Sequence, residues 1–452
     1  MMPFTHAARP SDAVSDAVSD AASDDAFGKA ARGLRRSIRR GVRASRAVLV
    51  AAGLLAAATP GLGGGGLALA QAAPGWDETL AAARGQTVFW NAWAGDEKTN
   101  AFIAWVGEQV KAKYGVSVQH VRLKDTAEAV TRVVAEKSAG RDTDGSVDLI
   151  WINGPNFLNM KRQGLLYGPV TDRLPNARYI DTTKKRSNVI DFTTPVEGLA
   201  VPWRMAQIVF IYDSARIRDG AAVPRSAQAM LEWARRNPGR LTHPDVSNFL
   251  GSTFLKQALY ELTPDPALLQ KPADDADFDK AVSPLWAWYD QLKPLLWRKG
   301  QQFPANGPAQ RQLLNDGEID ITISFNPSEA AVAVQAGLLP PSVRTFTFSR
   351  GTIGNTSFVA IPYNAKAKAG AMVVANFLID PATQARAQDI DTMGNLNVLD
   401  LSTLSEADRR RFAMRTDSPA LPDAEELGSP LLEPHASWMT RITEQWQKRY
   451  TR

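Results

Sequence analysis

Several side chains that could hold a small molecule follow an apolar segment of this sequence. The segment 147–152, VDLIWI, is followed directly by Asn153, Gly154, Pro155 and Asn156. Each amide side chain offers both hydrogen-bond donors and acceptors. A covered strand that ends in such groups indicates that its end faces a crevice in which something polar is held.

The same mixture of amides, small hydroxyls, charged groups and single aromatic rings recurs at other predicted strand ends and helix starts. In open α/β sheets, ligands bind beyond the carboxyl ends of the strands. The candidate ligand-binding residues are Asn91, Trp93, Asp96, Asn153, Asn156, Trp203, Arg204, Gln207, Ser252, Thr253, Asn326 and Asn355. Each also fits an ordinary role in a turn, a helix cap or the core, so the prediction depends on the pattern across the set.

The charge of the expected ligand stays open at this point. The predicted helix starts at Asn156 and Gly251 suit an anion, whereas Trp93 and Trp203 suit a cation or a planar ring.

Motifs for catalysis, metals and phosphates are missing from the sequence or incomplete. The stretch GLGGGG at 61–66 has no strand before it, and the Asp-rich stretch 275–280 lacks the glycine of a calcium loop. Only His120, His243 and His435 follow the predicted leader, and none has an obvious metal-binding partner. The sequence therefore predicts no catalytic residue, metal or cofactor, and the protein is expected not to be an enzyme. A carboxylate pair for glycoside hydrolysis is not nominated, but a secreted carbohydrate-active hydrolase remains the alternative.

The N-terminus has the pattern of an exported protein. Residues 1–33 are rich in Ala, Ser and Asp and predict a disordered extension. Residues 34–72 combine a basic block, an apolar stretch at 47–58 and small residues, which is typical of a signal peptide cleaved after Ala70 or Ala72. The apolar stretch is far shorter than the roughly 20 residues that span a bilayer. Sec and twin-arginine export both stay open.

The charge balance and the absence of cysteine narrow the class of protein further. The whole chain has 52 basic and 47 acidic residues, but nine and five of these lie in the first 70 residues, so the mature chain is near +1. This balance argues against nucleic-acid or membrane-surface binding. The absence of cysteine excludes a disulfide and a lipidated cysteine. A periplasmic protein without direct membrane insertion is predicted, and a monomer is expected.

Strands and helices alternate three times after the leader, which predicts βαβ units and a parallel sheet, hence an α/β fold. The predicted strands are 86–93, 116–123 and 147–153, and the predicted helices are 99–115, 125–140 and 155–166.

A second set of elements begins near residue 198. Pro202 is expected to break a long strand and mark one crossing between two lobes, with the return crossing in 337–348, so that the two crossings form a hinge. A strand is predicted at 240–244 and one continuous helix at 369–390. The predicted organisation is 73–201 and about 345–400 for lobe 1, 202–344 for lobe 2, and 401–452 for a C-terminal helical tail.

Four stretches together resemble a known family. The stretches are FWNAWAGDEKTNAFIAWV, GSVDLIWINGPNFLNMKRQGLLYGP, VPWRMAQIVFIYD and GTIGNTSFVAIPYNA. They are similar to segments of YnjB-like extracellular solute-binding proteins of ABC importers. The resemblance implies a two-lobed type II periplasmic-binding-protein fold and delivery of a small-molecule solute to the permease subunits of an ATP-driven importer. A thiamine-like solute is the one that the resemblance suggests. A sensing role shares the fold and is not separated from transport by sequence.

Overall fold

The computed structural model describes residues 75–218, 223–274, 277–413 and 418–451. All of them fall within one compact unit, Ala72–Arg452. The predicted N-terminal extension and signal peptide lie outside the described residues. No helix in the described part of the chain is both long enough and apolar enough to cross a membrane.

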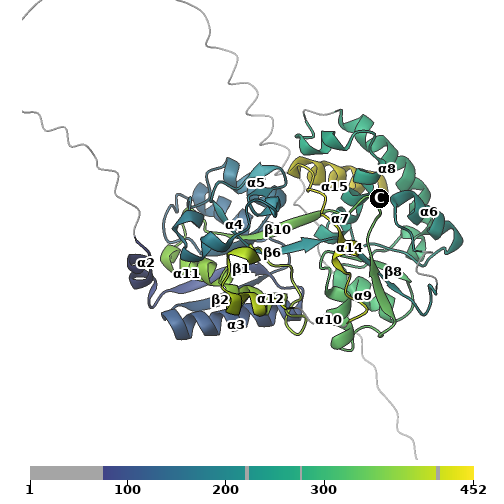
Figure 1. Cartoon of the computed structure of the whole chain (residues 1–452). Coiled ribbons are helices and arrows are strands. Elements are labelled where there is room, and N and C mark those ends of the chain that lie inside the picture. The colour runs from purple at the N-terminus through teal and green to yellow at the C-terminus, as the bar shows by residue number, and fades with distance from the viewer. Residues whose placement is uncertain (1–74, 219–222, 275–276, 414–417, 452) are drawn as a thin grey trace, which may run out of the picture. The chain divides into compact units, whose positions relative to one another are not determined.

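A five-stranded sheet forms the core of lobe 1, the name used here for this sheet and its helices (Figure 1). The order across the sheet is β2 (Ser117–Leu123), β1 (Thr87–Trp93), β3 (Leu149–Ile152), β10 (Gly354–Ala360) and β6 (Ala200–Gln207). β1 pairs in parallel with β2 and β3, while β10 is antiparallel to β3 and β6. The predicted parallel βαβ units are therefore confirmed.

Helices cover both faces of this sheet. They are α2 (Trp76–Ala83), α3 (Glu97–Tyr114), α11 (Lys368–Leu378) and α12 (Pro381–Gln388) on one face, and α4 (Ala127–Ser138) and α5 (Gly154–Arg162) on the other. Trp90 and Val88 of β1 pack with Ile103 of α3, and each side chain of this size contributes about 1.5–3 kcal/mol when buried. Apolar side chains therefore fill the space between this sheet and its helices.

The ends of α3 have clear local causes. Asp96 accepts a hydrogen bond from the backbone N–H of Thr99 at 2.8 Å, which caps the first turn. Gly115 ends the helix with φ of 70°, a conformation that glycine adopts without steric cost.

Lobe 2 is built on a three-stranded antiparallel sheet with the order β8 (Ile321–Ser324), β7 (Val209–Asp213) and β9 (Val343–Phe346). One face packs against α6 (Ala227–Arg236), α7 (Phe249–Leu262), α8 (Phe278–Leu292) and the C-terminal helix α15 (Ala436–Tyr450). The other face packs against α9 (Gly307–Asn315) and α10 (Glu329–Gln335). The remaining short elements are β4 (Ile190–Asp191), β5 (Thr194–Pro195), α13 (Glu406–Arg410) and α14 (Ala424–Leu427).

The chain passes between the two sheets at the ends of β6 and β10. The predicted strand break at Pro202 is wrong, because β6 runs without interruption from Ala200 to Gln207. Proline is tolerated there since β6 is the edge strand and one of its sides needs no ladder hydrogen bond. The change of sheet lies at Ile208, and the return passes through residues 347–353. The lobe boundaries given above stay predictions.

Two further sequence predictions need correction. The expected single helix at 369–390 is two helices, because Asp380 accepts a hydrogen bond from the N–H of Ala382 at 3.0 Å and Pro381 starts α12. The expected strand at 240–244 is reduced to one β-bridge, between Leu241 and Ile321.

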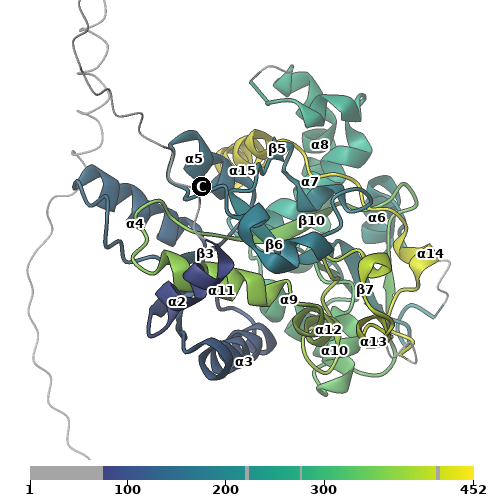
Figure 2. The same cartoon turned by 60° about the vertical axis from the view of Figure 1, so that its left-hand side comes forward.

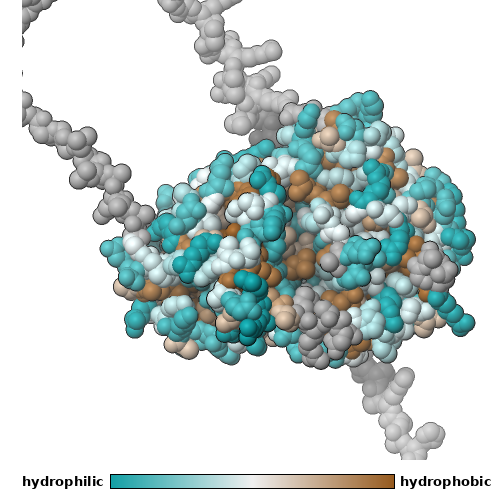
Figure 3. All heavy atoms as spheres, in the orientation of Figure 1, coloured by the Kyte–Doolittle hydropathy of each residue, from teal (hydrophilic) through white to brown (hydrophobic). Residues whose placement is uncertain are grey.

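The two lobes also contact each other away from these crossings. In both ribbon views α15 lies beside α5 (Figure 1 and Figure 2), and Gln335 of α10 donates a hydrogen bond to Asp391, which follows α12. In Figure 3, apolar residues gather in the middle of the visible face, near β6 and β10. Of the described large hydrophobic residues, Leu338 and Leu432 are the exposed ones.

Candidate functional site

A cluster of aromatic rings and one guanidinium lies at the carboxyl ends of β1, β3 and the middle of β6. Trp93 is the last residue of β1, and its ring meets that of Trp151 of β3 edge-on, with 6.3 Å between centroids. The Trp151 ring also meets that of Trp203 at 5.0 Å. The guanidinium carbon of Arg204 lies 5.1 Å from the centroid of Trp151 and 5.6 Å from that of Trp203. We call these four residues the Trp–Arg cluster.

A β-bulge explains why two consecutive residues of β6 contact the same ring. Arg204 is opposite Ser357 of β10, and Pro202 is opposite Phe358, so Trp203 has no partner of its own. A bulge changes the direction of side chains that would otherwise alternate between faces. Trp203 and Arg204 can therefore both contact Trp151.

Arg204 lacks the partners that a guanidinium normally has in a protein interior. Its Nε is buried and makes no hydrogen bond. Within the described part of the chain, the guanidinium forms no ion pair or hydrogen bond at all. Burial lowers the pKa of Arg204 to about 10, against the opposing negative charge of Asp96. Asp96 is itself engaged as the cap of α3, through Thr99 N–H at 2.8 Å and Thr99 Oγ1 at 2.7 Å.

Trp203 and Trp93 have different surroundings. Trp203 is only 1% exposed and packs against Trp90 and Phe102, with centroids at 5.8 and 6.3 Å. Trp93 is partly buried, and a Cβ at Gly95 would come within 2.3 Å of its ring. The structure thus gives Trp203 a packing role. Trp93 is the ring at the edge of the cluster, and it can take this position because Gly95 has no side chain to collide with it.

A second group of polar residues lies buried where elements of both lobes meet. Lys256 of α7 forms an ion pair with Glu433 at 2.6 Å, and both side chains are buried. Asn355 of β10 donates to Glu433 Oε1 at 2.8 Å. Asp191 of β4 accepts from the N–H of Gly154 at 2.6 Å, while its other oxygen has no partner. We call Asp191, Lys256, Glu433 and Asn355 the buried charge cluster.

Burial governs the titration of this cluster. It raises the pKa of Asp191 well above its ordinary value, and the nearby charge of Glu433 acts in the same direction. Burial favours the neutral forms of Lys256 and Glu433, lowering the pKa of the first and raising that of the second, while their contact opposes both shifts.

Aromatic rings enclose the ammonium group of Lys256. Its Nζ lies 4.6 Å from the centroid of Phe192 and 4.9 Å from that of Phe249. Phe192 sits in the β4–β5 turn with φ of 45°, followed by Thr193 with φ of 65°. Such left-handed conformations cost of order 1–3 kcal/mol in residues other than glycine. The turn therefore stores strain while it presents Phe192 to a residue of the other lobe.

The other predicted site residues divide into two groups. Asn153 and Asn156 lie at the start of α5, partly buried, and their side chains make no hydrogen bond within the described residues. They stay candidates for contact with a ligand. Asn91, in contrast, is fully buried and accepts from Arg132 at 3.0 Å, so its amide already has a partner.

Four predicted residues lie in lobe 2 or at the crossings. Gln207 donates to the carbonyl of Leu427 at 2.7 Å, at the change of sheet. Asn326 donates to the carbonyl of Met393 at 3.0 Å. Ser252 and Thr253 are buried within α7, and the hydroxyl of Thr253 makes no hydrogen bond. None of these four belongs to either cluster.

Sequence reasoning missed three members of the buried charge cluster, Asp191, Lys256 and Glu433. Lys256 had a detectable signal, because it is the one charged residue in an otherwise uncharged and largely apolar stretch of α7, FLGSTFLKQAL. Glu433 gave none, since it is 177 positions from its partner and belongs to a Pro-rich segment.

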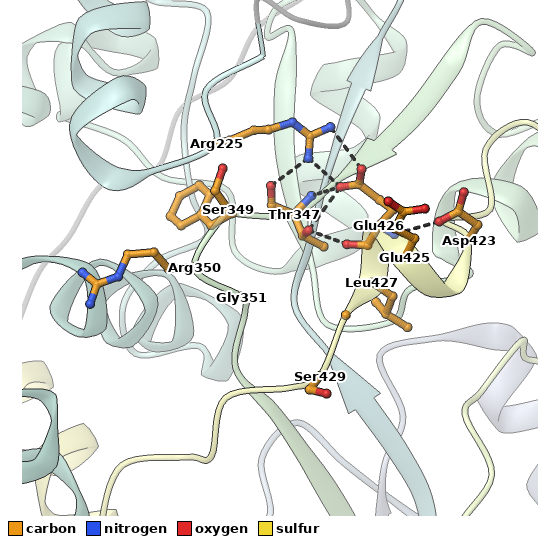
Figure 4. Close-up of a pocket in the computed structure, with 12 residues that line it drawn as sticks. Arg225, Thr347, Ser349, Arg350, Gly351, Asp423, Glu425, Glu426, Leu427 and Ser429 are labelled. Carbon is orange, nitrogen blue, oxygen red and sulfur yellow. Dashed lines mark hydrogen bonds and ion pairs between the residues drawn. The ribbon is translucent and has the colours of Figure 1, made fainter.

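A cavity of about 540 Å³ opens elsewhere, between residues 347–351 and 423–429 (Figure 4). Two of its charged groups pair with each other, since Arg225 binds both carboxylate oxygens of Glu426 at 2.7 and 3.1 Å. Glu426 also accepts from the N–H of Thr347 at 2.7 Å. These contacts brace one crossing between the lobes, and the cavity includes no member of the Trp–Arg cluster. Among the described residues, no group of three or more His, Cys, Asp or Glu could hold a metal ion.

Comparisons with known proteins agree with this architecture. The family described as bacterial extracellular solute-binding protein matches residues 105–407. Protein YnjB of Escherichia coli is 42% identical over 382 residues, which cover 84% of this chain and 95% of YnjB.

Solved structures of low sequence identity share the fold. The TpPotD lipoprotein of Treponema pallidum has a TM-score of 0.58 at 14% identity, covering 81% of this chain and all of that one. The periplasmic binding protein AfuA of Actinobacillus pleuropneumoniae, solved with fructose-6-phosphate, has a TM-score of 0.55 at 14% identity, covering 80% of this chain and 98% of that one. The predicted two-lobed α/β fold is confirmed. By family match and by overall identity to YnjB, the chain belongs to the bacterial extracellular solute-binding proteins.

Proposed function

We propose that this protein is the periplasmic solute-binding subunit of an ABC importer. It captures one small polar or aromatic solute by closure of the two lobes and delivers it to the permease subunits in the membrane. The solute leaves chemically unchanged. The observation that carries the proposal is the Trp–Arg cluster, in which the guanidinium of Arg204, without a partner among the described residues, lies against Trp151 near the carboxyl ends of β1 and β3.

Such a site can supply the binding free energy that closure of the lobes requires. To raise the closed population from 1% to 99%, the solute must bind the closed form about 5.5 kcal/mol more tightly than the open form. Hydrogen bonds to charged groups contribute about 1.5–3 kcal/mol each, and neutral ones about 0.5–1.5 kcal/mol. Arg204, Asn153 and Asn156 together with one stacked ring supply groups of these kinds.

The identity of the solute is a finer matter. A thiamine-like solute is the candidate that the resemblance suggests. AfuA, which shares the fold, was solved with fructose-6-phosphate, a ligand chemically different from a thiamine-like solute. The fold therefore does not select among them, and the side chains of the site must.

The proposal also covers location. A signal peptide at 34–72 would direct the chain to the periplasm and be removed there. A monomer suffices for capture by closure.

Native mass spectrometry tests the proposal. The mature protein, purified without denaturation, should carry one small molecule per chain that is released intact on unfolding. Conversion of that molecule into a product, or failure to retain or capture any molecule from a cell extract, would contradict it.

A secreted hydrolase is the competing function, and it would need accessible carboxyl groups. The carboxyl groups with raised pKa in the buried charge cluster belong to Asp191 and Glu433, which are 2% and 4% exposed. Hydrolysis of a carbohydrate by the purified protein would favour that function over solute capture.

A further inference from the structure

We propose that the solute carries an anionic oxygen group, a carboxylate or a phosphate, and that Arg204 binds this group. The inference rests on the proposed function, because it assigns the charge of the solute held at the Trp–Arg cluster.

The first step is the unmatched charge of Arg204. Other partly buried arginines in the described residues bind an oxygen of the protein, either of a carboxylate, as Arg216 does with Asp213 at 3.1 Å, or of a neutral group, as Arg173 does with the Tyr167 hydroxyl at 3.0 Å. Arg204 has no such partner, although its Nε is buried. A hydrogen-bond donor of a charged group that is removed from water without a partner is costly, so a site that keeps one is arranged for a group supplied from outside.

The second step is access. Arg204 as a whole is only partly buried. Within the part of the chain that the structure describes, its two Nη atoms make no hydrogen bond and, unlike Nε, are not buried, so they keep contact with solvent. Nε is held against the protein while the Nη atoms remain available to a ligand.

The third step is the shape of the group. A guanidinium presents its donors in a planar fork that matches the two oxygens of a carboxylate or a phosphate. The guanidinium carbon of Arg204 lies 5.1 and 5.6 Å from the ring centroids of Trp151 and Trp203, and these cation–π contacts reduce the loss of side-chain freedom on binding. The Trp93 ring next to Trp151 offers an apolar face for the body of the solute.

A purely cationic solute does not fit this arrangement. The acid that acts on Arg204 is Asp96, whose Oδ2 accepts from the N–H and the hydroxyl of Thr99 and whose negative charge already opposes the charge of Arg204. A bare cation beside Arg204 would meet a like charge and would have to share Asp96 with Arg204. The sequence left the charge of the ligand open. A negative charge is therefore assigned to the end of the solute that contacts Arg204.

The test uses inorganic phosphate and acetate as probes on the full mature protein. Their apparent affinities are measured from the shift of the melting temperature, with sodium chloride at equal ionic strength as reference. At least one oxyanion should stabilise the parent protein, and Arg204→Gln should weaken that effect 10-fold or more. Phosphate acting more strongly than acetate identifies a phosphate group, and the reverse identifies a carboxylate.

Two further variants keep the result interpretable. Arg386→Gln is the matched control, since Arg386 also stacks on a tryptophan, Trp105, at 4.6 Å, but is exposed and outside the cluster. It should leave the oxyanion effect unchanged. Arg204→Lys keeps the charge but loses the fork, so it should fold and lose part of the effect.

The outcomes separate this inference from the proposed function. Equal oxyanion effects in the parent and Arg204→Gln, or none in the parent, would overturn the inference. A retained solute that is purely cationic would also overturn it while leaving solute capture intact. Oxyanion binding through Arg204, combined with chemical turnover of the bound molecule, would support the inference and end the proposed function.

Discussion

At the scale of single residues, the buried charge cluster connects the two lobes through groups that have lost contact with water. Lys256 and Glu433 form their pair at 2.6 Å, and Asn355 occupies the other oxygen of Glu433. A buried pair need not add stability compared with apolar residues, but breaking it leaves one charge unpaired. The cluster should therefore be sensitive to single substitutions and tolerant of matched double ones.

Lys256→Met is predicted to lower the free energy of unfolding by about 3–5 kcal/mol, because Glu433 is left buried without its partner. Chemical denaturation measures this loss. The double variant Lys256→Met/Glu433→Gln should recover a large part of it. Lys366→Met is the control, since Lys366 is exposed and 3.9 Å from Asp144. A loss below about 1 kcal/mol in Lys256→Met would mean that the pair does not hold the lobes together.

Asp191 gives a prediction for pH. Burial raises the pKa of Asp191, so the folded protein keeps this proton over a pH range in which the unfolded chain has already released it. The free energy of unfolding then falls as pH rises from the unfolded pKa, about 4, toward the raised folded pKa. Asp191→Asn removes this contribution and keeps an acceptor for the N–H of Gly154. Urea unfolding between pH 4 and 8 should show a shallower decline in the variant, and identical slopes would contradict the assignment.

At the scale of elements, the strands and helices that carry the site follow from the sequence, but the bulge in β6 does not. Apolar runs with capping residues such as Asp96 and Gly115 predict β1, α3 and β3, and hence which residues lie at strand ends. The bulge depends on how β6 pairs with β10, about 150 positions later, which local pattern cannot encode. Trp203, predicted as a ligand-binding residue, contributes a buried packing ring to the Trp–Arg cluster.

The two tryptophans should separate stability from binding. Trp203→Ala removes a ring that is 1% exposed and should lower the free energy of unfolding by about 3–5 kcal/mol. Trp93→Ala, at a partly exposed ring, should cost about 1 kcal/mol but weaken solute affinity 10-fold or more. Denaturation and titration calorimetry on both variants measure the two effects. An unchanged stability of Trp203→Ala would show that its ring is not part of the core.

At the scale of the whole molecule, two sheets are joined by two crossings and a C-terminal segment that binds along both. Gln207 at one crossing and Thr347 at the other each donate a hydrogen bond to a backbone carbonyl of residues 426–427. The N–H of Gly354 donates to the carbonyl of Leu431 at 2.9 Å. The sequence predicted two crossings and a C-terminal helix, yet not that the segment before this helix braces the crossings. Its contacts are long-range hydrogen bonds to backbone groups, which leave no pattern in the sequence.

Capture by closure of this molecule is tested most directly by a crystal structure of the protein with the solute that it retains on purification. The solute should be chemically intact, with an anionic oxygen group on the Nη atoms of Arg204, its body against Trp93, and contacts to residues of both lobes. Density for a reaction product, or for an intact solute in the 540 Å³ cavity beside Glu426 and away from Arg204, would contradict the account.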